Sequence, residues 1–110
     1  MTANSIPWTQ GEAPWQGEFR GADFGSGVSI IFTRIDRPGG GVKLHRHPYS
    51  ETFIVRKGTV VFSDGTSSFE ASAGRIVVIP PGMPHMFSTK SDEVEMIDIH
   101  ANHRFVTEWL

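Results

Sequence analysis

Three of the five histidines and one glutamate are the residues in this chain best suited to chemistry. His45 and His47 lie two positions apart, so on a β-strand both imidazoles project from the same face. Glu51 opens the next apolar segment, and its carboxylate can join the two histidines across an antiparallel strand pair. His85 follows a turn rich in proline and glycine and shares a strand face with Phe87. The spacing thus predicts that three imidazoles and one carboxylate converge.

A group of three imidazoles and one carboxylate suits a divalent first-row transition metal, namely Fe, Mn, Ni, Zn or Cu. Calcium or magnesium would use more oxygen ligands. We expect one such ion per chain, held by His45, His47, Glu51 and His85. An octahedral ion held by four protein groups keeps open positions for water, dioxygen or substrate, which is what separates a catalytic metal from a closed structural one.

Strands are the elements that must position these groups. Short apolar runs alternate with glycine- and proline-containing separators from residue 28 onward, which is typical of an all-β sandwich or barrel. Asp64-Gly65 between two such runs predicts a tight hairpin. The tail from Asn102 to Leu110 could form a short helix or a strand. The expected strands are Val28–Ile35, Val42–His47, Thr52–Arg56, Thr59–Ser63, Ser67–Ala71, Arg75–Ile79, His85–Ser88 and Val94–His100.

Composition excludes several classes of protein. A chain of 110 residues is long enough for one domain. The formal charge of −2 argues against nucleic-acid binding, and no apolar run is long enough to cross a membrane. The absence of cysteine excludes disulfide frameworks and thiol nucleophiles, and the polar residues 1–5 do not resemble a secretory signal. We therefore expect a cytoplasmic protein with a small-molecule ligand or substrate.

Residues 1–18 are expected to form an N-terminal arm, and residues 19–110 the β-barrel domain. The arm carries Trp8 and Trp15, which would be unfavourable if exposed to water. Two interpretations stay open at this stage. The arm could pack on its own barrel, or it could dock on a second subunit.

Glycines and prolines fall at fixed distances from the candidate ligands. Gly39 precedes the His45-x-His47 pair and Glu51 and Gly58 follow it, and Gly74 with Pro80-x-Gly82 precedes His85. A chance match at so many positions is remote at average amino-acid usage. Residues 39–58 and 74–85 resemble the two motifs of the cupin superfamily, the small jelly-roll β-barrels. Thr89 is a departure, because the second motif often has asparagine at that place, which is not a ligand.

The resemblance implies a single jelly-roll barrel from about Val28 to His100, in which His45, His47, Glu51 and His85 take the metal-ligand places. Because the family often pairs its barrels, it also implies a homodimer. Family members that lose ligands serve as binding or storage folds, whereas this chain keeps all four.

Further residues have candidate roles at the site. Lys43 shares strand parity with His45 and could bind a substrate carboxylate or enolate, or it could be solvated if the strand end twists. Tyr49 could act as an acid, a base or a hydrogen-bond donor, or it could simply pack. His100 could be a general base, support a ligand, or lie at the rim without a role. Asp98 shares a face with His100 and must be paired if that face is inward, because a lone buried carboxylate is costly.

Parity alone does not separate core residues from pocket residues. Phe53 and Phe87 are taken as substrate-binding candidates, while His103 is expected at the surface. The other core or pocket candidates are Ile30, Phe32, Phe62, Met83, Met86 and Met96. Arg34, Arg56 and Arg75 are expected on solvated faces.

Two functions compete. The first is a metal-dependent enzyme acting on a small chelating molecule, of dioxygenase, isomerase, decarboxylase or lyase type, in which Glu51, His100 and Tyr49 are catalytic. The second is a non-catalytic module or sensor that binds a small molecule or a metal. Turnover that depends on the metal ligands would distinguish the first from the second.

Overall fold

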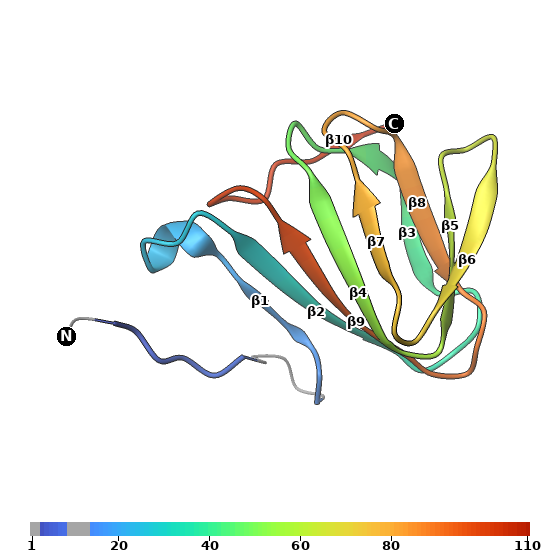
Figure 1. The fold of residues 1–110 in the computed structure, drawn as a ribbon, viewed down its shortest axis with the longest axis horizontal. Coiled ribbons are helices and arrows are strands. Elements are labelled where there is room, and N and C mark those ends of the chain that lie inside the picture. The colour runs from blue at the N-terminus through green and yellow to red at the C-terminus, as the bar shows by residue number, and fades with distance from the viewer. Residues whose placement is uncertain (1–2, 9–13) are drawn as a thin grey trace.

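The structure, a computed structural model, describes residues 3–8 and 14–110. These residues are almost entirely β-strand, apart from one short 3₁₀ turn at Gly21–Asp23 (Figure 1). The strands are β1 Gly17–Phe19, β2 Ser29–Ile35, β3 Gly41–Arg46, β4 Glu51–Lys57, β5 Thr59–Ser63, β6 Ser68–Ser72, β7 Ile76–Ile79, β8 His85–Thr89, β9 Val94–His100 and β10 Glu108–Trp109. The all-β prediction is confirmed, and β5 and β9 have the predicted bounds. Within the described ranges, no helix has the length and apolarity needed to span a membrane.

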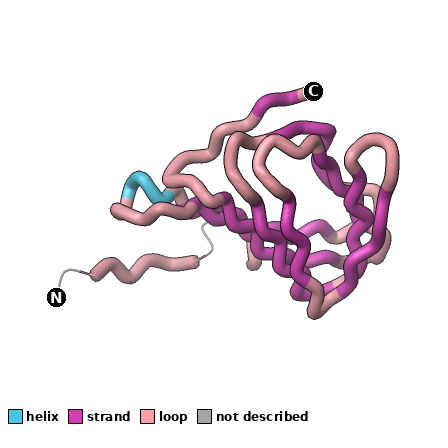
Figure 2. The backbone as a smooth tube through the Cα atoms, turned by 45° about the horizontal axis from the view of Figure 1, so that its top comes forward, coloured by secondary structure: helices cyan, strands magenta, loops and turns pink. Residues whose placement is uncertain are grey.

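Two antiparallel sheets face each other in a jelly-roll arrangement (Figure 2). The first sheet has the strand order β1-β2-β9-β4-β7, and the second has the order β10-β3-β8-β5-β6. The hydrogen-bonded ladders do not run on from one sheet into the other, so the described strands form an open sandwich rather than the closed barrel that we expected. β1 and β7 are the edge strands of the first sheet, and β10 and β6 are those of the second.

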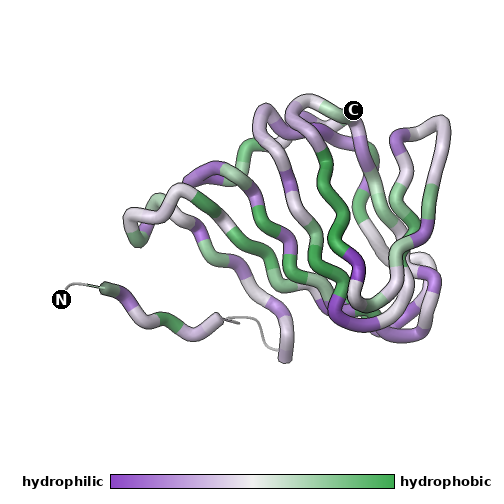
Figure 3. The backbone as a smooth tube through the Cα atoms, viewed as in Figure 1, coloured by the Kyte–Doolittle hydropathy of each residue, from purple (hydrophilic) through white to green (hydrophobic). Residues whose placement is uncertain are grey.

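Strand alternation builds the core between the sheets. In β4 the side chains of Phe53 and Val55 are buried, and their partners across the sandwich include Phe62 and Phe87. The three phenylalanine rings contact one another edge-on or tilted, with centroids 5.0–6.0 Å apart. Figure 3 shows apolar residues running along these strands. This core fills one end of the sandwich and leaves the other end for polar side chains.

The tail forms a strand rather than a helix. β10 pairs with β3, placing Trp109 opposite His45, and the Arg46 guanidinium makes two hydrogen bonds of 2.8 and 2.9 Å to the Glu108 carboxylate. These contacts hold the C-terminal segment across the end of the sandwich where β3 and β9 finish (Figure 1).

The described part of the N-terminal arm packs on its own chain. Trp15 is 7% exposed, and its indole N–H donates to the Met96 carbonyl at 3.1 Å. Trp8 contacts both Trp15 and Phe32, with ring centroids 4.6 and 5.5 Å apart. This favours the first interpretation for Trp15, whereas Trp8 is still 56% exposed and positions 9–13 lie outside the described residues. β1 begins at Gly17, two residues before the expected domain boundary, which stays a prediction.

Candidate metal centre

The predicted ligands meet at one end of the sandwich. His45 is the penultimate residue of β3 and His85 begins β8, so the second sheet supplies both, and they pair directly across its ladder. His47 follows β3, and Glu51 begins β4 in the first sheet. One ligand atom from each of these residues lies within 4.8 Å of all the others, and all four side chains are buried.

Backbone carbonyls fix the protonation of the three imidazoles. Each Nδ1–H donates to a main-chain oxygen: His45 to Lys43 at 2.6 Å, His47 to Val106 at 2.8 Å and His85 to Met83 at 2.9 Å. A neutral imidazole with a proton on Nδ1 has its lone pair on Nε2. In its neutral form each ring therefore directs the Nε2 lone pair to the side away from these carbonyls, and such carbonyl partners are typical of metal-binding histidines.

The Glu51 carboxylate faces these nitrogens. Its Oε1 lies 2.6 Å from His85 Nε2 and 3.1 Å from His47 Nε2. In the described chain His47 Nε2 is fully buried and makes no hydrogen bond. Nitrogen lone pairs and a carboxylate at these distances need a proton or a cation between them, because they otherwise repel. The donor set of nitrogens and one carboxylate oxygen fits a divalent transition metal. The cluster could hold such an ion, although the geometry does not select which one.

A second polar group adjoins the cluster. His100 Nε2 lies 3.1 Å from Glu51 Oε2 and 3.2 Å from Asp98 Oδ2. His100 Nδ1 shares a hydrogen bond of 2.6 Å with the Tyr49 hydroxyl, which also accepts the Val106 N–H at 3.1 Å. Asp98 thus has the buried partner that the sequence required. These contacts connect Glu51 through His100 and Tyr49 to Val106 in the C-terminal segment.

Charge in this group is set by burial and by close partners. Burial alone would raise the pKa of Glu51, but hydrogen bonds from the surrounding imidazoles, His100 first, hold it below its ordinary value. Burial opposes the charged form of His100, yet Asp98 and Glu51 raise its pKa to about 11. For Asp98, burial and the neighbouring Glu51 charge raise the pKa. Burial lowers the pKa of His45, which keeps that ring neutral and able to bind a metal.

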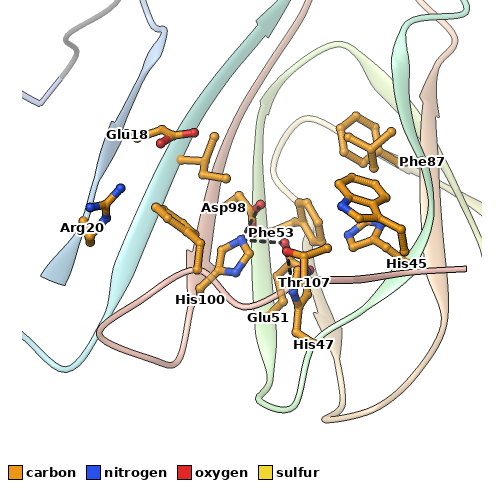
Figure 4. A pocket seen from close by; sticks show the side chains of 14 residues that line it. Glu18, Arg20, His45, His47, Glu51, Phe53, Phe87, Asp98, His100 and Thr107 are labelled. Carbon is orange, nitrogen blue, oxygen red and sulfur yellow. Dashed lines mark hydrogen bonds and ion pairs between the residues drawn. The ribbon is translucent and has the colours of Figure 1, made fainter. Parts of the chain in front are cut away.

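The cluster forms part of the wall of a cleft of about 370 Å³. This is within the size range of small-molecule sites. Figure 4 shows the cleft from close by, with His45 and Phe87 on one side and Glu18 and Arg20 on the other. Its lining residues are Glu18, Arg20, Ile31, Val42, His45, His47, Glu51, Phe53, Phe87, Asp98, His100, Phe105, Thr107 and Trp109.

Lys43 is exposed and does not line the cleft, in contrast to our expectation from strand parity. The cause is an irregularity in the β3–β8 ladder. Val42 pairs with Phe87 and His45 with His85, so β3 has one residue more than β8 between these pairs. Such a β-bulge reverses the alternation of side chains. Val42 therefore faces inward with His45.

The remaining candidates divide between cleft and core. Phe53 and Phe87 line the cleft, and their contact with a substrate stays a prediction. Tyr49 is buried beside His47, with the two rings stacked 5.2 Å apart, and does not line the cleft. Of the other candidates, Phe62 and Met96 are in the core, Phe32 packs on the tryptophans, Met83 is 43% exposed, and Ile30 and Met86 are half-buried.

Several cleft residues were not found from the sequence. Glu18 and Arg20 belong to β1 and the residue after it, within a segment assigned to the arm and its junction. Glu18 and Arg20 lie two positions apart, a spacing that could have indicated that both project from the same face of a strand. Phe105, Thr107 and Trp109 come from the tail, whose course over the site depends on the β10–β3 pairing and has no local sequence signal.

Comparison with known proteins places the fold. Residues 32–100 match the family described as "Cupin domain". No curated protein matches the chain. A cupin-like protein from Thermotoga maritima is 26% identical, covering 76% of this chain and 65% of that one, with a TM-score of 0.68. A cupin-2 domain containing protein from Shewanella frigidimarina is also 26% identical, covering 66% and 69% of the two chains, with a TM-score of 0.58.

A larger enzyme shares the fold at lower identity. Oxalate decarboxylase from Bacillus subtilis, an enzyme described as having Mn(II) centres, has a TM-score of 0.72 at 19% identity. The match covers 84% of this chain but only 27% of that enzyme's chain. The family match spans most of the described strands and both ligand-bearing motifs, and the resemblance inferred from the sequence is confirmed. The chain is a member of the cupin family.

Proposed function

We propose that this protein is a metal-dependent enzyme that acts on a small organic molecule. The observation that carries the proposal is the convergence of three imidazole rings and one carboxylate in the wall of a cleft of ligand size. The four groups supply the protein part of a coordination sphere, and the cleft gives a small molecule access to it. A bound divalent ion would act as a Lewis acid that polarises a carbonyl or carboxylate oxygen of the substrate.

The side chains around the cluster have separate tasks. Phe53 and Phe87 line the cleft, and the Phe53 ring packs edge-on against His85; this apolar wall excludes water and strengthens electrostatic interactions inside the cleft. Glu51 uses Oε1 toward His47 and His85 and Oε2 toward His100, so it can hold a ligand position while it exchanges a proton on its other oxygen.

We assign proton transfer to His100 and Tyr49, with Glu51. His100 Nε2 lies between two carboxylates, and its raised pKa of about 11 keeps the ring protonated at neutral pH. His100 lines the cleft, so the proton can reach a substrate there. Tyr49 fixes the other ring nitrogen and connects it to the tail. Groups placed in this way contribute general acid and base catalysis.

Reactions of dioxygenase, isomerase, decarboxylase and lyase type all use a metal-bound chelating substrate, and the donor set is compatible with Fe, Mn, Ni, Zn or Cu. Mn²⁺ is the first ion to test, because the oxalate decarboxylase that shares the fold is described as having Mn(II) centres. The substrates to test are hydroxy acids, keto acids, oxalate, β-diketones, catechols, thiols and sugars.

The test compares the metal-stripped protein with protein reloaded with each ion. Product formation and oxygen uptake are followed across the substrate panel, and bound metal is quantified in the same samples. We expect turnover with at least one ion, and its loss in His47→Ala. His103→Ala is the matched control, because His103 is exposed and outside the cluster. Turnover in His47→Ala at the wild-type rate would refute the proposal, and ligand binding without turnover under every ion would favour a non-catalytic module.

We also propose that two copies associate through the outer face of the first sheet. The outward-facing positions of an antiparallel sheet usually carry polar side chains, but two cross-strand rows on this face are strongly apolar. One row runs Ile76, Ile54, Ile97 and Phe32, and the other runs Val78, Thr52, Ile99, Ile30 and Phe19. Ile76 and Val78 are 65% and 61% exposed.

A second copy of the chain is the partner that we propose for this face. A homodimer with two-fold symmetry brings the same patch of each copy together, which is the commonest arrangement of homodimers. Trp8 and Trp15 pack on Phe32 at the end of one row, and Phe24 stacks on Phe19 at the end of the other. Ile76 and Val78 are exposed at the opposite ends of the two rows.

A further inference from the structure

We propose that Arg20 binds an anionic group, a carboxylate or a phosphate, on the small molecule whose other end lies at the histidine–glutamate cluster. This inference rests on the proposed function, because it concerns the substrate of the same cleft. The ligand would have one end at the cluster and a second, negatively charged end that Arg20 recognises.

The register of the first sheet places Arg20 level with the cluster. Gly21 N–H donates to Ser29 Oγ at 3.1 Å, which holds the chain after β1 beside the start of β2. Ser29 pairs with His100, and His100 pairs with Glu51. At about 4.8 Å per strand, the Arg20 backbone is two strand intervals, about 10 Å, from that of His100. An arginine side chain spans much of that gap, so a small molecule can touch both.

Arg20 is the cation available to a ligand in the cleft. Among the residues that the structure describes, it is the only lysine or arginine that lines the cleft. The bulge in β3 turns Lys43 away, so the role expected for Lys43 passes to a residue on the opposite wall. Figure 4 shows Arg20 on the β1 side of the cleft, with His100 between it and the labelled candidate ligands His45, His47 and Glu51.

The Arg20 guanidinium is not engaged elsewhere in residues 3–8 and 14–110, where it makes neither an ion pair nor a hydrogen bond. Glu18 faces the same cleft two residues earlier, but the two side chains form no ion pair. An unengaged guanidinium can bind a carboxylate or phosphate with two parallel hydrogen bonds. Glu18 would then accept a hydroxyl of the same ligand.

A second basic residue extends the site. Arg20 and Arg104 both line a smaller hollow of about 300 Å³ that also includes Phe105. Phe105 lines the cleft as well, and its ring packs edge-on against His100 with centroids 4.9 Å apart. Arg20 and Arg104 thus both border the hollow next to the cleft, and only Arg20 lines the cleft as well. Asp23 also lines this hollow and limits its positive charge, which makes Arg20 the main determinant.

The test uses pairs of chelating acids that differ in one distal charge. Racemic lactate is compared with racemic malate, and glycerate with 3-phosphoglycerate, so that the two pairs separate a carboxylate from a phosphate. Binding to the Mn²⁺-loaded protein is measured by calorimetry. We expect one doubly charged acid to bind about tenfold more tightly than its partner, because a hydrogen bond to a charged group contributes that much.

Arg20→Gln should abolish this preference while leaving Mn²⁺ affinity and the affinity for lactate or glycerate unchanged. Arg75→Gln is the matched control, because Arg75 is exposed and lines neither hollow, and it should keep the full preference. The proposal is overturned by equal affinities within both pairs in the wild type, or by a preference that survives Arg20→Gln. A wild-type protein that takes up no metal overturns the proposed function as well, whereas a preference without turnover supports the role of Arg20 alone.

Discussion

Replacement of Tyr49 by phenylalanine tests whether the Tyr49–His100 contact stabilises the metal site. The variant keeps the ring that stacks on His47 and removes only the hydroxyl. His100 Nδ1 then loses its 2.6 Å partner in a buried position, while the exposed Val106 N–H can turn to water. A buried polar group left without a partner costs about 1–3 kcal/mol. We therefore expect the free energy of unfolding of the metal-free protein to fall by about 1–3 kcal/mol.

Urea unfolding at neutral pH measures this change through the midpoint, with the slope as a check that the transition itself is unaltered. Thr107→Val is the control, since it also removes a hydroxyl near His47, but one that is exposed and 3.4 Å from the ring nitrogen. Its effect should stay within about 0.5 kcal/mol. Equal effects of the two variants would refute the role given to Tyr49. Metal affinity should be nearly unchanged in Tyr49→Phe, because no Nε2 atom moves, while turnover should fall.

Three further predictions concern the motif glycines, the outer sheet face and pH. Gly58→Ala should lower the free energy of unfolding, measured in urea, by more than Gly74→Ala does. Both glycines have positive φ (80° and 93°), which disfavours alanine at either position. Only the alanine Cβ at position 58, however, would lie 2.1 Å from a backbone carbonyl oxygen, which belongs to the β8–β9 loop. Ile76→Lys with Val78→Lys should shift sedimentation from dimer to monomer with metal content unchanged, and a wild-type monomer would contradict the proposed interface. Burial lowers the pKa of His45, so metal affinity should stay constant from pH 8 to about 6.5 and decline at lower pH, where protons compete for the ligand nitrogens. Calorimetry at a series of pH values measures this affinity. An affinity that increased as pH fell would contradict the prediction.

Much of the metal centre could be predicted because its signals are local. The His45-x-His47 spacing and the strand parity of Glu51 follow from a two-residue repeat, and the turns at Gly58 and Gly74 require positive φ. These features depend on a few neighbouring residues. They are sufficient to predict the fold class and the four candidate ligands.

Other parts of the site depend on pairings between distant segments. Lys43 was misplaced because a bulge changes parity without any glycine or proline to mark it. Trp109 reaches His45 through the β10–β3 ladder, and Arg20 reaches the cleft through β1, whose pairing with β2 has only three residue pairs. Sheet closure likewise depends on edges that the strand pattern does not reveal.

The most direct test of the central claim is a crystal structure of the protein loaded with Mn²⁺, with anomalous data collected to locate the ion. We expect one strong anomalous peak per chain, at bonding distance from Nε2 of His45, His47 and His85 and from a Glu51 oxygen. A peak bound through Nδ1 atoms, a peak elsewhere in the chain, or no peak with the four side chains directed apart would contradict it.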